Sequence, residues 1–108
     1  MQLREFVTGV KEERDALLAS YAGADAPTNV AEQLRAAKLT DEQRCYVLAA
    51  LDAALTDAFY TLLLGLDGAA SLNGSQQSYR IIDERGNVVS PGDGSLEALA
   101  FDVFQTAG

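Results

Sequence analysis

The chain contains no histidine and no tryptophan, a single cysteine, Cys45, and only two prolines among its 108 residues. One cysteine cannot form an internal disulfide, and a structural zinc cluster is excluded. Because histidine is absent, a Cys-His nucleophile cannot be assembled. We therefore expect Cys45 to be a small buried hydrophobic residue rather than a reactive group.

Positive charge is also scarce, since 8 Lys and Arg stand against 16 Asp and Glu, a net charge of -8 at pH 7. A chain this acidic repels phosphate backbones, so we expect no nucleic-acid partner. The acidity favours solubility and steering toward a basic partner. The abundance of alanine and the preference for Arg over Lys are typical of a high-GC bacterium.

Long apolar runs are missing as well. The longest, around Leu62 to Leu66, is far too short to span a membrane. The first residues, 1–5, have no apolar segment of the kind found in a signal peptide. From these two observations we expect a cytoplasmic protein with no membrane partner.

The stretch from Leu39 to Gly68 carries the strongest structural signal. Thr40 and Gln43 form a capping box, and Gly65 and Gly68 are candidate C-cap residues. Between them apolar residues recur with helical spacing: Leu48, Leu51, Leu55, Phe59, Leu62 and Leu66. We predict a central helix over 41–66. Leu51, Leu55 and Phe59 on its buried face should be almost fully buried, so that Leu55→Ala would cost about 2–5 kcal/mol.

The rest of the chain predicts a single α+β domain that is predominantly α. Apolar stripes predict helices at about 2–21 and 30–38 before the central helix, and at about 96–106 after it, with Ser95 as N-cap. A loop over 69–77 contains a possible Asn73-Gly74 turn. A β-hairpin at about 79–90 is expected, with 83–86 as a type I turn and Gly86 in a left-handed conformation.

Charged residues on the apolar helices are the candidate chemical groups. Arg14 interrupts the apolar stripe of the first helix, and Asp52 and Asp57 are its natural partners if that helix packs antiparallel to the central one. An intrahelical or surface ion pair is the alternative. Asp52 and Asp57 are also the only pair that an enzyme or ligand-binding protein would use here. We expect no catalytic, cofactor-binding or metal-binding residues, because the patterns that these sites require are absent.

The expected function is binding to another protein. In size, acidity and lack of catalytic groups the chain resembles small bacterial immunity proteins and antitoxin-like inhibitors, a resemblance of class that implies a protein partner. The alternative is a structural homodimer, because the leucines near the end of the central helix leave no polar face there. The residues expected to make these contacts are Tyr79, Arg80, Ile82 and Arg85 of the hairpin, with Leu63 and Leu64 of the helix.

Overall fold

The computed structural model describes residues 2–105 and has the predicted α+β, predominantly α, architecture. Its elements are α1 (Leu3–Ala22), α2 (Asn29–Ala36), α3 (Asp41–Leu66), β1 (Ile81–Ile82), β2 (Val88–Ser90) and α4 (Ser95–Gln105). Three helices, a hairpin and a C-terminal helix therefore follow in the predicted order. The predicted end of the last helix, at residue 106, lies outside the described residues.

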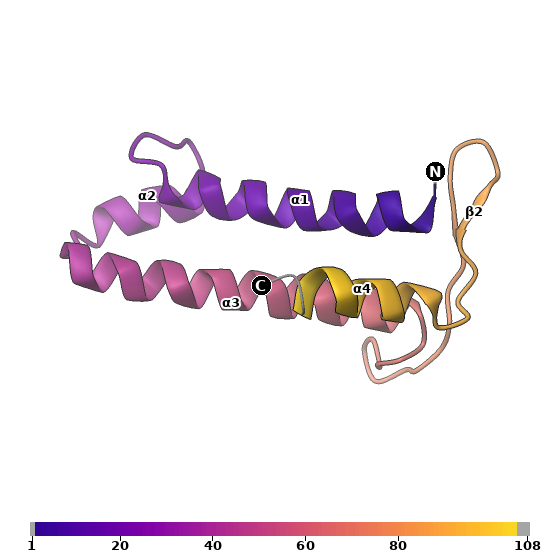
Figure 1. Cartoon of the computed structure of the whole chain (residues 1–108). Helices are drawn as coiled ribbons and strands as arrows, with labels where there is room; N and C mark the ends of the chain where they lie inside the picture. Colours follow the sequence, from indigo (N-terminus) through magenta and orange to yellow (C-terminus); the bar gives the residue numbers. More distant parts are fainter. Residues whose placement is uncertain (1, 106–108) are drawn as a thin grey trace.

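The helices form an elongated bundle (Figure 1). α1 and α3 run antiparallel along most of its length, and α2 connects them at one end. α4 lies beside the C-terminal half of α3, and the hairpin stands at the end near the start of α1. The molecule measures 46 × 29 × 26 Å, and its radius of gyration of 16.4 Å exceeds the roughly 13 Å typical of a chain of this length.

The core occupies the end of the bundle where three helices meet. Its buried residues come from α1, α3 and α4: Val7, Leu63, Leu96, Ala100 and Phe104. The prediction that Leu51, Leu55 and Phe59 are almost fully buried is wrong, because all three are half-buried. Leu63, near the end of α3, is the residue of this helix in the buried cluster. α4 has 11 residues and lies beside the C-terminal half of α3, so Leu51 in the other half is not covered by it. That half is covered from one side only, by α1 and α2.

The ends of α3 are built as the sequence indicates. Thr40 Oγ1 accepts from the backbone N of Gln43 at 3.1 Å, and the Gln43 side chain accepts from the Thr40 backbone N at 2.9 Å. At the other end Gly68 has φ +80°. The Ala69 N–H donates to the Leu64 carbonyl at 2.9 Å. This pattern is a Schellman motif, which requires a residue such as glycine in the left-handed region.

Gly65 is not a cap residue, contrary to the expectation for it. It is buried within α3, and a Cβ at this position would lie 2.5 Å from the Leu72 side chain. Leu72 is held there by a two-residue turn, Asn73-Gly74, with φ +52° and +75°. The backbone groups of Leu72 and Ser75 pair across this turn in both directions. The suspected turn is therefore real, and it folds the 69–77 loop back onto α3.

The hairpin follows its prediction in turn type and is shorter in its strands. The Gly86 N–H donates to the Asp83 carbonyl at 3.0 Å, and Gly86 has φ +85°. Only 81–82 and 88–90 pair as strands, with an irregularity between Ile81 and Ile82. Val89 and Ser90 are buried, so one side of the hairpin packs on the helices.

The start of α4 differs from the prediction that Ser95 is its N-cap. Ser95 is the first residue of the helix, and the Gly94 carbonyl accepts the bond from the Ala98 N–H. The cap is supplied by two aspartates. Asp93 Oδ1 accepts from the Ser95 N–H and hydroxyl at 3.1 and 2.6 Å. Asp67 accepts from the Gly94 N–H at 3.1 Å and the Glu97 N–H at 2.9 Å.

Candidate interaction surfaces

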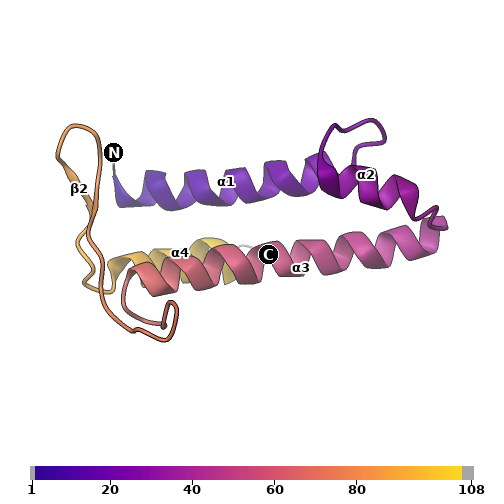
Figure 2. The same cartoon turned by 180° about the vertical axis from the view of Figure 1, so that it is seen from behind.

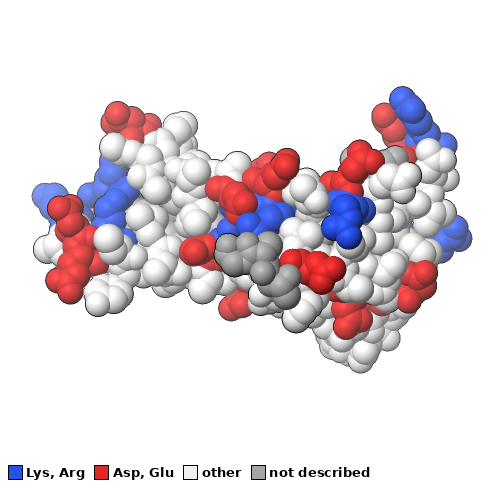
Figure 3. Space-filling model, viewed as in Figure 1, with Lys and Arg blue, Asp and Glu red and all other residues white. Residues whose placement is uncertain are grey.

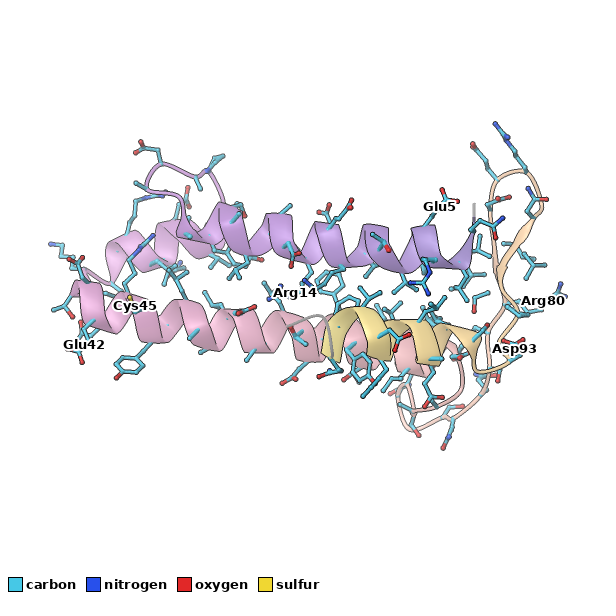
Figure 4. All side chains as sticks on the ribbon, in the orientation of Figure 1. Glu5, Arg14, Glu42, Cys45, Arg80 and Asp93 are labelled. Atoms are coloured by element: carbon cyan, nitrogen blue, oxygen red, sulfur yellow. The ribbon has the colours of Figure 1, made fainter. Side chains whose placement is uncertain are left out.

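Arg14 is the one buried cation among residues 2–105, with 5% of its surface exposed. It points from α1 toward α3 (Figure 4). Its Nη2 forms an ion pair with the Asp52 carboxylate and donates to the Asp52 carbonyl at 3.1 Å, while Nη1 pairs with Asp15. The predicted Arg14–Asp52 pair is confirmed, and the neighbouring Asp15 adds the intrahelical pair that was its alternative. Arg14 and Asp52 line a hollow between α1, α3 and α4. Because two carboxylates already neutralise the guanidinium, this hollow is no anion site.

The structure does not bring Asp52 and Asp57 together. Five residues apart on a helix, they point about 140° away from each other. Asp52 lines the hollow around Arg14, whereas Asp57 is exposed and is not among the residues of that hollow. Among residues 2–105 there is also no group of three or more His, Cys, Asp or Glu side chains placed to hold a metal ion. The arrangement offers no shared cleft for a pair of carboxylates.

An apolar groove runs between α1 and α3. Its volume is about 290 Å³, and its walls are Glu5, Phe6, Gly9, Val10, Glu13 and Phe59. Phe6, Val10 and Phe59 pack against the core and stay half-buried. Gly9 leaves the groove open, because nothing lies within 4 Å of the position of a Cβ on it. In Figure 2 α1 and α3 lie side by side, α4 lies behind α3, and α2 lies at the end of α1 away from the N-terminus.

α3 also exposes much apolar surface outside this groove. An 18-residue window of this helix has a mean hydropathy of 1.6, yet only 6% of that window is buried. By length and composition alone α3 is apolar enough to cross a membrane, although none of its uninterrupted apolar runs is that long. Cys45 near its start is exposed (labelled in Figure 4), so the expectation of a buried cysteine is wrong.

The predicted contact residues fall into different environments. Arg80, Ile82 and Arg85 are exposed on the hairpin, and Arg80 points away from the helices (Figure 4). Tyr79 is half-buried, and its backbone N–H donates to the Leu66 carbonyl at 3.0 Å. The hairpin thus packs on the helices through one side and presents the other to solvent.

The two leucines of α3 separate. Leu63 is only 2% exposed and belongs to the chain's own core, so its surface is not available to a second subunit. Leu64 is half-buried at the edge of the helix. The burial of Leu63 relative to Leu64 could not be predicted from the sequence, because three consecutive leucines of a helix point in three directions. The position of α4 decides which of them is covered.

Acidic side chains are spread along the face seen in Figure 3, with uncharged areas between them. Three aspartates carry a pKa below the ordinary value. The Lys11 hydrogen bond lowers the pKa of Asp15, the Asn87 N–H lowers that of Asp83, and the Ser95 hydroxyl lowers that of Asp93. All three remain negatively charged at neutral pH, so the described surface keeps its acidic character.

Comparison of the chain with protein-family models, with curated proteins and with solved structures finds no significant match.

Proposed function

We propose that this chain is a non-enzymatic, acidic protein-interaction module that binds a basic partner through the groove between α1 and α3. The observation that carries the proposal is the composition of that groove. Phe6, Val10 and Phe59 give it an apolar floor, and Glu5 and Glu13 stand at its borders. An apolar groove of this kind accepts the apolar face of an amphipathic helix, and the two glutamates select for basic flanking residues.

The spacing of the glutamates limits the partner further. Glu5 and Glu13 are eight residues apart on α1, which is about 12 Å along the helix axis. A partner helix lying along the groove would match them with basic residues seven or eight positions apart on one side. The apolar residues of the partner would recur every three or four positions between them.

A synthetic peptide tests this proposal directly. The probe is a fluorescent amphipathic helix with leucines on one face and two lysines seven positions apart, and its binding is measured by fluorescence anisotropy at low and high salt. We expect binding that weakens as salt is raised, because the ion pairs at the border are exposed. The same peptide with glutamates in place of the lysines should bind at least tenfold more weakly.

Two variants locate the binding on the protein. Gly9→Leu places a side chain in the groove at a position where a Cβ meets no atom within 4 Å, and it should abolish binding. Glu13→Lys should weaken binding, whereas Glu12→Lys is its matched control because Glu12 is exposed on α1 and does not line the groove. If Gly9→Leu binds the peptide as well as the unaltered protein, the groove is not the binding site and the proposal fails.

A further inference from the structure

One face of α3, which we call the outer face, points away from α1. It consists of Tyr46, Ala50, Ala53, Asp57, Thr61 and Leu64. Their spacing of three or four residues keeps them within about a quarter of the helix circumference over five turns, or about 27 Å. The first five are exposed and Leu64 is half-buried. Tyr46 is 71% exposed, and Asp57 is the single charge of this face.

The exposed area of the chain is larger than a monomer of this size usually has. Its accessible surface is 6872 Å², whereas about 5,800 Å² is typical for a monomer of 11.5 kDa. The excess, about 1,100 Å², is more than the roughly 800 Å² that each partner contributes to a standard interface. A second copy of the chain can cover a surplus of this size.

A hollow of about 460 Å³ borders the outer face between α3 and α4. It is lined by Tyr60, Gly94, Glu97, Ala98, Phe101 and Asp102. Phe101 is 50% exposed, and Tyr60 lies one helical turn before Leu64. The aromatic rings offer an apolar contact for another ring. The carboxylate of Glu97 at the border is an acceptor for a phenolic hydroxyl.

We propose that two copies pair through their outer faces, antiparallel and around a two-fold axis near residue 55. This axis places Tyr46 of each copy opposite Leu64 of the other, and the ring of Tyr46 enters the partner's hollow beside Phe101. Alanines at 50 and 53 let the two helices approach closely, while Asp57 lies beside the partner's Ala53 rather than beside the partner's Asp57. The interface is isologous, so each Tyr46–hollow contact occurs twice.

Sedimentation equilibrium at micromolar concentration tests the pairing. We expect a mass twice 11.5 kDa, and at least tenfold weaker dimerisation for Tyr46→Ala and for Phe101→Ala. Leu62→Ala is the matched control. Leu62 is also an exposed apolar residue of α3, 48% exposed, but it points about 140° away from the middle of the outer face. Circular dichroism verifies that each variant keeps its helices.

Mixing the two variants separates this arrangement from other dimers. A mixed dimer of Tyr46→Ala with Phe101→Ala retains one intact contact, because the tyrosine of the second chain meets the intact hollow of the first. Each variant alone retains none. The mixture should therefore dimerise more tightly than either variant.

Three outcomes would overturn the proposal. They are a monomer at about 100 μM, a dimer that Leu62→Ala weakens as much as Tyr46→Ala does, and a mixture no tighter than its components. A monomer that instead binds lipid vesicles through α3 would assign the apolar surface to a membrane. The groove experiment is independent, since Gly9→Leu should leave the dimer intact.

Discussion

The side chain of Asp67, the C-cap residue of α3, accepts a hydrogen bond from the backbone N–H of Glu97 in the first turn of α4. Its other carboxylate oxygen accepts from the Gly94 N–H. A buried aspartate, 6% exposed, thus closes one helix and caps the next, 30 residues further along the chain. The contact fixes α4 against the end of α3 and so positions both the core and the hollow beside Phe101.

We expect Asp67→Ala to lower the free energy of unfolding by about 1–3 kcal/mol, because two N–H groups at the start of α4 lose their acceptor. Asp67→Asn should cost less, since an amide oxygen still accepts one of the two bonds. Urea denaturation followed by circular dichroism measures both. Asp93→Ala, at an exposed position of the same turn, should cost less than Asp67→Ala. An equal loss would mean that the Asp67 cap adds nothing beyond an ordinary surface cap.

Gly65 and Gly9 are glycines inside helices for which opposite outcomes are expected. A methyl group at Gly65 meets the Leu72 side chain at 2.5 Å, so Gly65→Ala must displace that side chain, the 69–77 loop or α3. A destabilisation of about 1–3 kcal/mol is typical of such overpacking. Gly9→Ala meets open space and should stabilise by about 0.5–1 kcal/mol through helix propensity. Thermal melting of the pair tests this. A stabilising Gly65→Ala would contradict the close packing of Leu72.

The sequence predicted the elements well because their signals are local. The capping box of Thr40 and Gln43 and the turn at 83–86 depend on residues a few positions apart, and both appear as expected. Burial depends on which helix lies against which, and here the prediction failed. Leu55 was expected inside and is half-buried, because the buried core lies nearer the end of α3, around Leu63.

Long-range polar contacts were partly predictable. Arg14 interrupts an apolar stripe, which pointed to a carboxylate on a facing helix, and Asp52 is that partner. The Asp67 cap had no such signal, since an aspartate at a helix end looks like any solvated charge. The groove and the outer face could not be predicted from the sequence either, because each consists of surface that the neighbouring elements leave uncovered.

The core assignment is testable by comparing two leucines of α3. Leu63→Ala should cost about 2–5 kcal/mol, as is typical of a buried leucine. Leu55→Ala should cost clearly less, about half as much, because Leu55 is already partly in water. Denaturant titrations of both variants measure the difference. If Leu55→Ala lowered the free energy of unfolding more than Leu63→Ala, the core would lie around Leu55 rather than around Leu63, and the assignment would be wrong.

The buried Arg14 group should tolerate an apolar replacement better than the loss of one partner. Arg14→Met keeps an unbranched, though shorter, apolar side chain and removes the need to solvate a charge, so we expect a change within about 1–2 kcal/mol in either direction. Asp52→Ala leaves Arg14 buried with Asp15 alone and should destabilise by more than Arg14→Met does. The double variant should recover part of that loss. If the changes in the free energy of unfolding of the two single variants add up to that of the double variant, Arg14 and Asp52 do not stabilise each other.

The hydrogen bonds of Asp93 predict a specific dependence on pH. Ser95 lowers the pKa of this carboxyl below the value of 3.8 expected for an unfolded chain. A lowered pKa means that the ionised form stabilises the folded state. This contribution is therefore complete above pH 3.8 and disappears as the pH falls through the lower, folded-state pKa.

Asp93→Asn isolates this contribution from the relief of the overall negative charge, which acts on both proteins alike. At pH 6 the unaltered protein should melt at a higher temperature than Asp93→Asn, and the gap should narrow as the pH falls below 3.8. Asp25→Asn is a suitable control, because Asp25 is exposed in the 23–28 connection. A gap that persists undiminished at pH 2 would mean that the carboxylate charge of Asp93 does not support the start of α4.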